Sequence, residues 1–132
     1  MDSGASCHVT GDKSLFSSPV RPISPAGCMV TAYRARDGRQ LPIGGVGPIS
    51  CNGNFQLPDV MYVPDLRTGV ILVSVPQLAE LGYLVMFGGG QCHVKDQSSG
   101  KMVGNGWLDN QDGLYHLRFL KIASNTTDRM AP

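Results

Sequence analysis

The residues best suited to chemistry stand at the start of the chain, where the sequence reads Asp2-Ser3-Gly4-Ala5. A carboxylate in this setting can activate a water molecule, and a neighbouring hydroxyl can fix the carboxylate. Gly4 gives the backbone a turn that a side chain would hinder. These are the parts of an aspartic peptidase, with Asp2 as the catalytic carboxylate and Ser3, Gly4 and Ala5 as its supporting loop. Asp-Ser-Gly also occurs in ordinary surface turns, so the tetrapeptide alone leaves both interpretations open.

Aspartic peptidase chemistry needs a second carboxylate close enough to share one proton with the first, because two like charges in contact do not both ionise. The sequence contains no second Asp-Ser-Gly or Asp-Thr-Gly. Asp37-Gly38 and Asp112-Gly113 lack the hydroxyl and indicate turns. The second Asp2 must therefore come from another copy of the chain across a twofold axis, which makes a homodimer the expected assembly.

Length and composition favour one folded domain. The chain has 132 residues, of which 42% are hydrophobic and 16% charged, and its net charge of +1 gives no reason to expect direct nucleic-acid binding. No membrane-length apolar run and no secretory signal are visible, so we expect no membrane partner and no secretion. The four cysteines form no Cys-x-x-Cys pair, and reduced thiols in the cytoplasm or nucleus are expected.

Glycine and proline are frequent along the whole chain, with 17 and 9 copies. Short segments bounded by these residues are typical of β-strands, so we expect a mostly β fold. One short α-helix is predicted near residues 75–81, because Ser74 is a good N-cap and Gln77 completes a capping box. Pro76 in the first turn and Gly82 at the end agree with these limits. The apolar residues 70–73 predict a strand buried on both faces.

Strand pairs are predicted around turn signals such as Asp37-Gly38, Asn52-Gly53 and the Ser98-Ser99-Gly100 segment. The predicted strands are residues 28–33, 40–49, 55–57, 60–64, 83–87, 91–96, 101–103 and 114–119.

The return strand of the first predicted hairpin contains a glycine-rich segment, formed by Ile43, Gly44, Gly45, Val46 and Gly47. Dense glycines weaken a strand but allow bending and the close approach of another backbone. In an aspartic peptidase these residues would belong to the flap over the substrate cleft. A bulged strand without that role is an equally weighted alternative.

Two Cys-His pairs, Cys7-His8 and Cys92-His93, suggest zinc or cysteine-peptidase chemistry only at first sight. Neither pair has standard zinc-finger spacing, and adjacent residues on a strand point to opposite faces. Nothing in the sequence places either thiol beside an activating histidine. We expect no metal and no cofactor.

The order of short motifs along the chain resembles the protease region of copia-type retrotransposon polyproteins. The motifs that carry this resemblance are Asp2-Ser3-Gly4-Ala5-Ser6 with His8 and Thr10, Asp37-Gly38, Gly45 with Gly47, residues 59–64, residues 72–78, Gly82-Tyr83, Cys92, and Gly113-Leu114-Tyr115 with Leu117. Together they cover the chain up to about residue 120.

The resemblance implies a retropepsin-like domain over residues 1–120, a closed β-barrel or sandwich, followed by a polar tail at residues 121–132. It implies an aspartic endopeptidase that is active only as a homodimer, with one Asp2 from each chain, and that cleaves a polyprotein substrate. In this family residues equivalent to 70–81 support the catalytic loop.

Two departures from the family pattern lead to an alternative function. The family usually has a strand ending in Trp and two apolar residues before the aspartate, where this sequence has Met1 alone. Gly69-Val70-Ile71 also stands where Asn followed directly by Leu is expected. The alternative is a domesticated, catalytically inactive remnant that acts as a binding or regulatory module.

Overall fold

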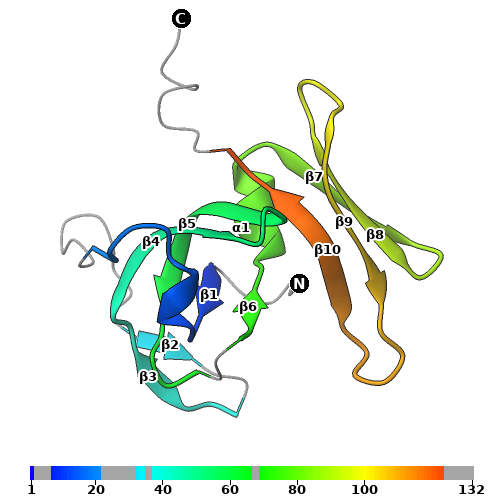
Figure 1. The fold of residues 1–132 in the computed structure, drawn as a ribbon. Coiled ribbons are helices and arrows are strands. Elements are labelled where there is room, and N and C mark those ends of the chain that lie inside the picture. The colour runs from blue at the N-terminus through cyan, green and yellow to red at the C-terminus, as the bar shows by residue number, and fades with distance from the viewer. Residues whose placement is uncertain (2–6, 22–31, 35–36, 67–68, 124–132) are drawn as a thin grey trace, which may run out of the picture.

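One large sheet dominates the computed structural model, which describes residues 1, 7–21, 32–34, 37–66 and 69–123 (Figure 1). Its elements in chain order are β1 (His8–Thr10), the 3-10 helix η1 (Lys13–Leu15), β2 (Ala32–Arg34), β3 (Gln40–Pro42), β4 (Gly45–Cys51), β5 (Phe55–Tyr62), β6 (Ile71–Leu72), α1 (Val75–Glu80), β7 (Tyr83–Gly88), β8 (Gln91–Asp96), β9 (Met102–Leu108) and β10 (Tyr115–Lys121). The prediction of a mostly β fold with one short α-helix is confirmed.

The main sheet has the order β6-β1-β5-β10-β9-β8-β7, and β4 also pairs with β5. Strand β1 lies parallel to β5 and antiparallel to β6. The predicted closure into a barrel is not observed, because the end strands β6 and β7 do not pair with each other in the described part of the chain. In Figure 1 the paired strands β7, β8 and β9 extend the sheet away from β1 to β6, so the two end strands lie apart.

Antiparallel strand pairs form around the predicted turns. Strands β2 and β3 pair around Asp37-Gly38, and the predicted residues 28–31 lie outside the described residues. At the turn between β4 and β5, Asn52 and Gly53 both have positive φ, 55° and 68°, which is the conformation that Asn-Gly favours. Strands β8 and β9 pair across residues 97–101.

The α1 helix begins as its sequence predicts. The Ser74 side chain accepts a hydrogen bond from the main-chain N–H of Gln77 at 3.1 Å, and Pro76 lies in the first turn. Gly82, just beyond the helix, has a φ of +88°. With six residues α1 is short, and no helix in the described ranges has the length and apolar character to cross a membrane.

Several strand boundaries differ from prediction. The predicted return strand at residues 40–49 is divided into β3 and β4. Residues 55–57 and 60–64 were expected as separate strands, but β5 is continuous across Pro58. This proline lies where β5 changes partner, between its pairing with β10 at Phe55 and with β1 at Val60, so its missing N–H costs little. Strand β9 continues beyond residue 103 through Gly106, where any Cβ would collide with the carbonyl oxygen of His116.

The prediction that residues 70–73 form a strand buried on both faces is wrong. Only Ile71 and Leu72 form β6, and both side chains are partly exposed. Strand β6 ends the sheet and pairs with β1 alone among the described strands, so one of its sides has no sheet neighbour.

Two clusters of buried side chains form the core. The larger one contains Ile49, Leu57, Val60, Val73, Leu78, Val94, Leu120 and Ile122. The smaller one contains Val9, Leu41 and Val63. Strand β1 therefore has an apolar neighbour on the face of Val9, while His8 and Thr10, also buried, point the other way.

Candidate functional site at the start of the chain

The predicted catalytic residues Asp2, Ser3, Gly4 and Ala5 lie outside the described residues. The structure therefore defines the elements that surround this segment and not its own geometry. Met1 precedes it, and β1, which begins at His8, follows it.

His8 connects β1 to the N-terminus of α1. Its side chain is buried, with a relative exposure of 1%, and its Nδ1 accepts a hydrogen bond from the main-chain N–H of Ser74 at 2.9 Å. Since Nδ1 is an acceptor, the proton of the neutral ring lies on Nε2. Nε2 has no hydrogen-bond partner in the part of the chain that the structure describes.

Burial determines the protonation of His8. Removal from water disfavours the charged imidazolium and lowers the pKa of His8 to about 4, from an ordinary value of 6.5. The hydrogen bond from Ser74 agrees with this direction, because a protonated Nδ1 would be a donor facing another donor. His8 is therefore neutral at physiological pH.

Gln77 joins three elements beside this histidine. Its Oε1 accepts a hydrogen bond from the main-chain N–H of His8 at 2.7 Å, and its Nε2 donates to the carbonyl of Asp59 at 3.1 Å. Further along β1, the Thr10 hydroxyl donates to the carbonyl of Val70 at 2.7 Å. Side chains of β1 and α1, with main-chain groups of β5 and of residues 70 and 74, thus hold the strand that follows the predicted catalytic loop.

The predicted flap segment lies in and beside β4. Ile43 packs against the smaller core cluster, and Gly44 donates a main-chain hydrogen bond to Tyr62 at 2.7 Å. Val46 pairs with β5 on one side and exchanges two 2.9 Å main-chain hydrogen bonds with Arg21 on the other. A Cβ on Gly45 would lie 2.7 Å from the carbonyl oxygen of Arg21.

A bulge interrupts the pairing of β4 with β5 between Gly47 and Ile49. The bulged strand, one of the two interpretations of this segment, is therefore observed. The flap role of Ile43, Gly44, Gly45, Val46 and Gly47 stays a prediction.

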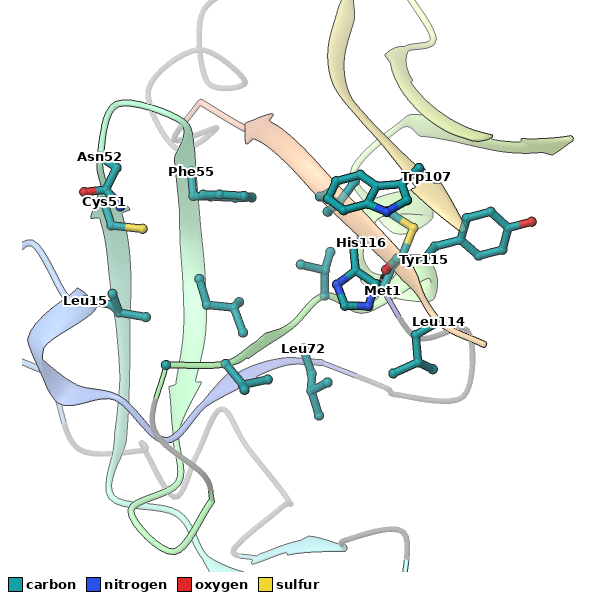
Figure 2. A pocket seen from close by; sticks show the side chains of 15 residues that line it. Met1, Leu15, Cys51, Asn52, Phe55, Leu72, Trp107, Leu114, Tyr115 and His116 are labelled. Atoms are coloured by element: carbon teal, nitrogen blue, oxygen red, sulfur yellow. Dashed lines mark hydrogen bonds between the residues drawn. The ribbon is translucent and has the colours of Figure 1, made fainter. Parts of the chain in front are cut away.

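A cavity of about 490 Å³ lies beside the start of the chain. It is lined by Met1, Leu15, Cys51, Asn52, Phe55, residues 69–73, Trp107, and residues 114–117. Figure 2 shows Trp107 and His116 on one side of this cavity and Leu15 and Phe55 on the other. The Met1 nitrogen donates a hydrogen bond to the carbonyl of Tyr115 at 3.0 Å, and both residues line the cavity.

Three possible metal ligands meet at the turn between β9 and β10. His116 Nε2 lies 2.7 Å from Asp112 Oδ2 and 3.7 Å from Asp109 Oδ2. The N–H of Leu114 is the largest cause of the lowered pKa of Asp112, and the His116 side chain adds to it. Each carboxylate also caps a main-chain N–H of the turn through Oδ1. The ring and the carboxylates thus satisfy one another at a partly exposed turn.

Neither Cys-His pair forms a metal-ligand group in the described residues, where Asp109, Asp112 and His116 are the one group with suitable spacing. Cys92 is buried, and burial raises the pKa of its thiol. A raised pKa opposes formation of the thiolate that cysteine-peptidase chemistry needs.

Sequence reasoning missed several residues of this region. The motif and the Cys-His pair that contain His8, and the capping box that contains Gln77, do not indicate the contacts of these residues between β1 and α1. Trp107 and His116 gave no local signal of a cavity, because its walls come from residues more than a hundred positions apart along the chain, such as Met1 and Tyr115.

A family comparison places these observations in context. Residues 1–83 match the family described as "Pol polyprotein, beta-barrel domain". No curated protein and no solved structure matches the chain. The matched residues include the Asp2-Ser3-Gly4-Ala5 segment, β1 to β6 and α1, and they exceed half of the 132 residues. The chain belongs to the family of Pol polyprotein β-barrel domains.

Proposed function

We propose that this chain is the aspartic endopeptidase of a copia-type retrotransposon Pol polyprotein, and that it acts as a homodimer. The observation that carries the proposal is the setting of β1. This strand directly follows Asp2-Ser3-Gly4-Ala5, lies between β5 and β6, and is tied to α1 through His8. A loop that precedes such a strand has a fixed point from which to present a carboxylate.

The proposed chemistry uses two Asp2 carboxylates that share one proton. The ionised carboxylate takes a proton from a water molecule, which attacks the carbonyl carbon of the scissile peptide bond. The protonated carboxyl group donates a hydrogen bond to the carbonyl oxygen and stabilises the negative charge that develops there. Each chain supplies one Asp-Ser-Gly, so the pair requires two chains.

The other loop residues have supporting roles in this proposal. The Ser3 hydroxyl braces the two catalytic loops, and Gly4 allows the backbone to approach its symmetry mate. The segment from Val70 to α1 supports the catalytic loop through its contacts with β1. Two contacts favour that role, the hydrogen bonds of Val70 with Thr10 and of Ser74 with His8.

Cleavage by wild-type protein and by Asp2→Asn tests the proposal. The substrate is a quenched-fluorescence peptide pool of mixed sequence, assayed at mildly acidic pH with and without a statine-type inhibitor. Wild-type protein should cleave the pool and be inhibited, and Asp2→Asn should have no activity above background. Asp37→Asn, in the exposed turn between β2 and β3, is the matched control and should retain full activity. Activity that survives in Asp2→Asn contradicts the mechanism.

A second candidate function is a non-catalytic binding module derived from such a protease. The cavity beside Met1 favours it, because a volume of about 490 Å³ with mainly apolar lining is suited to binding. A protein that stays monomeric at high micromolar concentration and cleaves no peptide, yet binds one, would support this second function.

A further inference from the structure

The connection between β9 and β10 brings an imidazole nitrogen and two carboxylate oxygens to one place. Asp109, Asp112 and His116 each contribute one of these atoms, and all three atoms lie within 4.8 Å of one another. The three residues belong to one continuous segment, 109–116, that the structure describes throughout. Nitrogen and oxygen ligands in one set are typical of transition-metal sites, whereas a purely acidic cluster has oxygen alone.

Hydrogen bonding between the three side chains explains only part of their arrangement. His116 Nε2 lies 2.7 Å from Asp112 Oδ2, which is a hydrogen-bond distance, but 3.7 Å from Asp109 Oδ2, which is too long for one. Asp109 Oδ2 therefore faces the ring without a hydrogen bond to it. A cation between the three atoms would contact all of them and would offset the repulsion between the two carboxylates.

The turn holds both carboxylates through their other oxygen. Asp109 Oδ1 accepts a hydrogen bond from the N–H of Gln111 at 2.8 Å, and Asp112 Oδ1 accepts one from the N–H of Leu114 at 2.9 Å. The main chain closes around them, because Asp109 donates to the carbonyl of Leu114 and accepts from the N–H of Gly113. Hydrogen bonds of this kind orient metal-binding carboxylates. Each Oδ2 is thus presented from a fixed position.

His116 is oriented from the neighbouring strand. It pairs with Trp107 across β9 and β10, and the two ring centroids are 5.7 Å apart with an interplanar angle of 30°. The guanidinium of Arg118 lies 5.0 Å from the centroid of the same indole. These ring contacts position the imidazole and leave Nε2 facing the carboxylates.

We propose that Asp109, Asp112 and His116 form a binding site for a divalent transition-metal ion, with zinc as the best fit. Zinc binds these atom types at about 2.0–2.2 Å, which in tetrahedral geometry places neighbouring ligand atoms about 3.3 Å apart. The separations of 2.7 and 3.7 Å in the turn lie on either side of that value. The imidazole disfavours magnesium and calcium, which prefer oxygen ligands alone.

The bound ion would fasten the start of β10 to the turn that follows β9. Asp112 is exposed and the other two ligands are partly exposed, so water can complete the coordination. This site goes beyond the proposed peptidase function, because none of its ligands belongs to the Asp2-Ser3-Gly4-Ala5 loop.

Trp107 provides a reporter beside the site, because it is the single tryptophan of the sequence and packs on His116. Full-length protein without an affinity tag is titrated with Ni²⁺, a paramagnetic ion that also binds imidazole and that quenches nearby indole fluorescence. We expect saturable quenching with one ion per chain. Zn²⁺, which has a filled d shell, should displace Ni²⁺ and restore the fluorescence, whereas Mg²⁺ should not.

Matched variants assign the binding to this turn. His116→Gln and His93→Gln each remove one imidazole, but His93 lies on β8 and is not part of the ligand group. Asp109→Asn and Asp112→Asn keep an oxygen for the turn N–H and remove the charge. We expect the affinity for Zn²⁺ to fall at least about tenfold in His116→Gln and in both Asn variants, and to be unchanged in His93→Gln and in Asp2→Asn.

Absence of saturable quenching in folded wild-type protein would overturn the proposal, and so would equal loss of affinity in His116→Gln and His93→Gln. Loss in His116→Gln alone, with both Asn variants unchanged, would indicate a single surface histidine and would also overturn it. The competition between Ni²⁺, Zn²⁺ and Mg²⁺ uses wild-type protein, so it holds even if a variant fails to fold. Failure of peptide cleavage would count against the peptidase function and leave this result unchanged.

Discussion

His8 Nδ1 accepts the main-chain N–H of Ser74 at 2.9 Å, and this contact joins the strand after the predicted catalytic loop to the first turn of α1. The two residues are 66 positions apart. The bond exists only with a neutral ring, because a protonated Nδ1 has no lone pair to offer. The position of β1 is therefore coupled to the protonation of one buried side chain.

Folding stability should fall at acidic pH because of His8. Its pKa is about 4 in the folded protein and 6.5 ordinarily, so the unfolded chain binds the proton more readily. The stabilising effect is complete above pH 6.5 and is lost as the pH falls toward 4. We expect His8 to reduce the free energy of unfolding by about 2 kcal/mol between about pH 7.5 and about pH 5.

Urea unfolding at several pH values checks this expectation in wild-type protein and in His8→Asn. The Asn side chain keeps an acceptor for Ser74 but does not titrate, so its stability should depend less on pH. The carboxylates titrate in both proteins, and the difference between the two curves isolates His8. Parallel curves would show that His8 has no such role.

Gln77→Ala should destabilise the fold by about 1–2 kcal/mol, because it removes the acceptor for the His8 N–H and the donor to the Asp59 carbonyl. Chemical denaturation of wild-type protein and of Gln77→Ala measures the difference in the free energy of unfolding. Glu80→Ala, on the exposed side of the same helix, should change stability by less than about 0.5 kcal/mol. Equal effects of the two substitutions would contradict the role assigned to Gln77.

Gly45→Ala distinguishes a packed strand from a mobile flap. The added Cβ would lie 2.7 Å from the Arg21 carbonyl oxygen, a backbone atom, so the packed strand predicts a loss of about 1–3 kcal/mol. Thermal unfolding measures it. Gly88→Ala is the control, because nothing lies within 4 Å of its Cβ position. Unchanged stability with reduced peptide cleavage in Gly45→Ala would favour a flap.

The local parts of the fold could be predicted from the sequence. Asn52-Gly53 specifies its turn through two positive φ angles, and Ser74 with Gln77 specifies the start of α1. These signals depend on residues that are neighbours in the sequence. They led to the correct β class and to the correct helix.

The arrangement of the strands could not be predicted in the same way. The parallel pairing of β1 with β5 and the gap between β10 and β6 depend on contacts between distant segments. The run at residues 70–73 is apolar, yet β6 is partly exposed, because hydrophobicity alone does not distinguish a strand inside a sheet from one at its edge. The cavity could not be predicted either, because its walls come from residues that are far apart in the sequence, such as Met1 and Tyr115.

The most direct test of the central claim is the activity of mixed chains. Wild-type and Asp2→Asn proteins are mixed in equal amounts, allowed to exchange subunits, and assayed for peptide cleavage at constant total protein. If each active site needs Asp2 from two chains, activity should fall to about one quarter of that of wild-type protein alone, which is the fraction of wild-type dimers. A fall to only about one half, as independent active chains would give, contradicts a shared pair of Asp2 carboxylates.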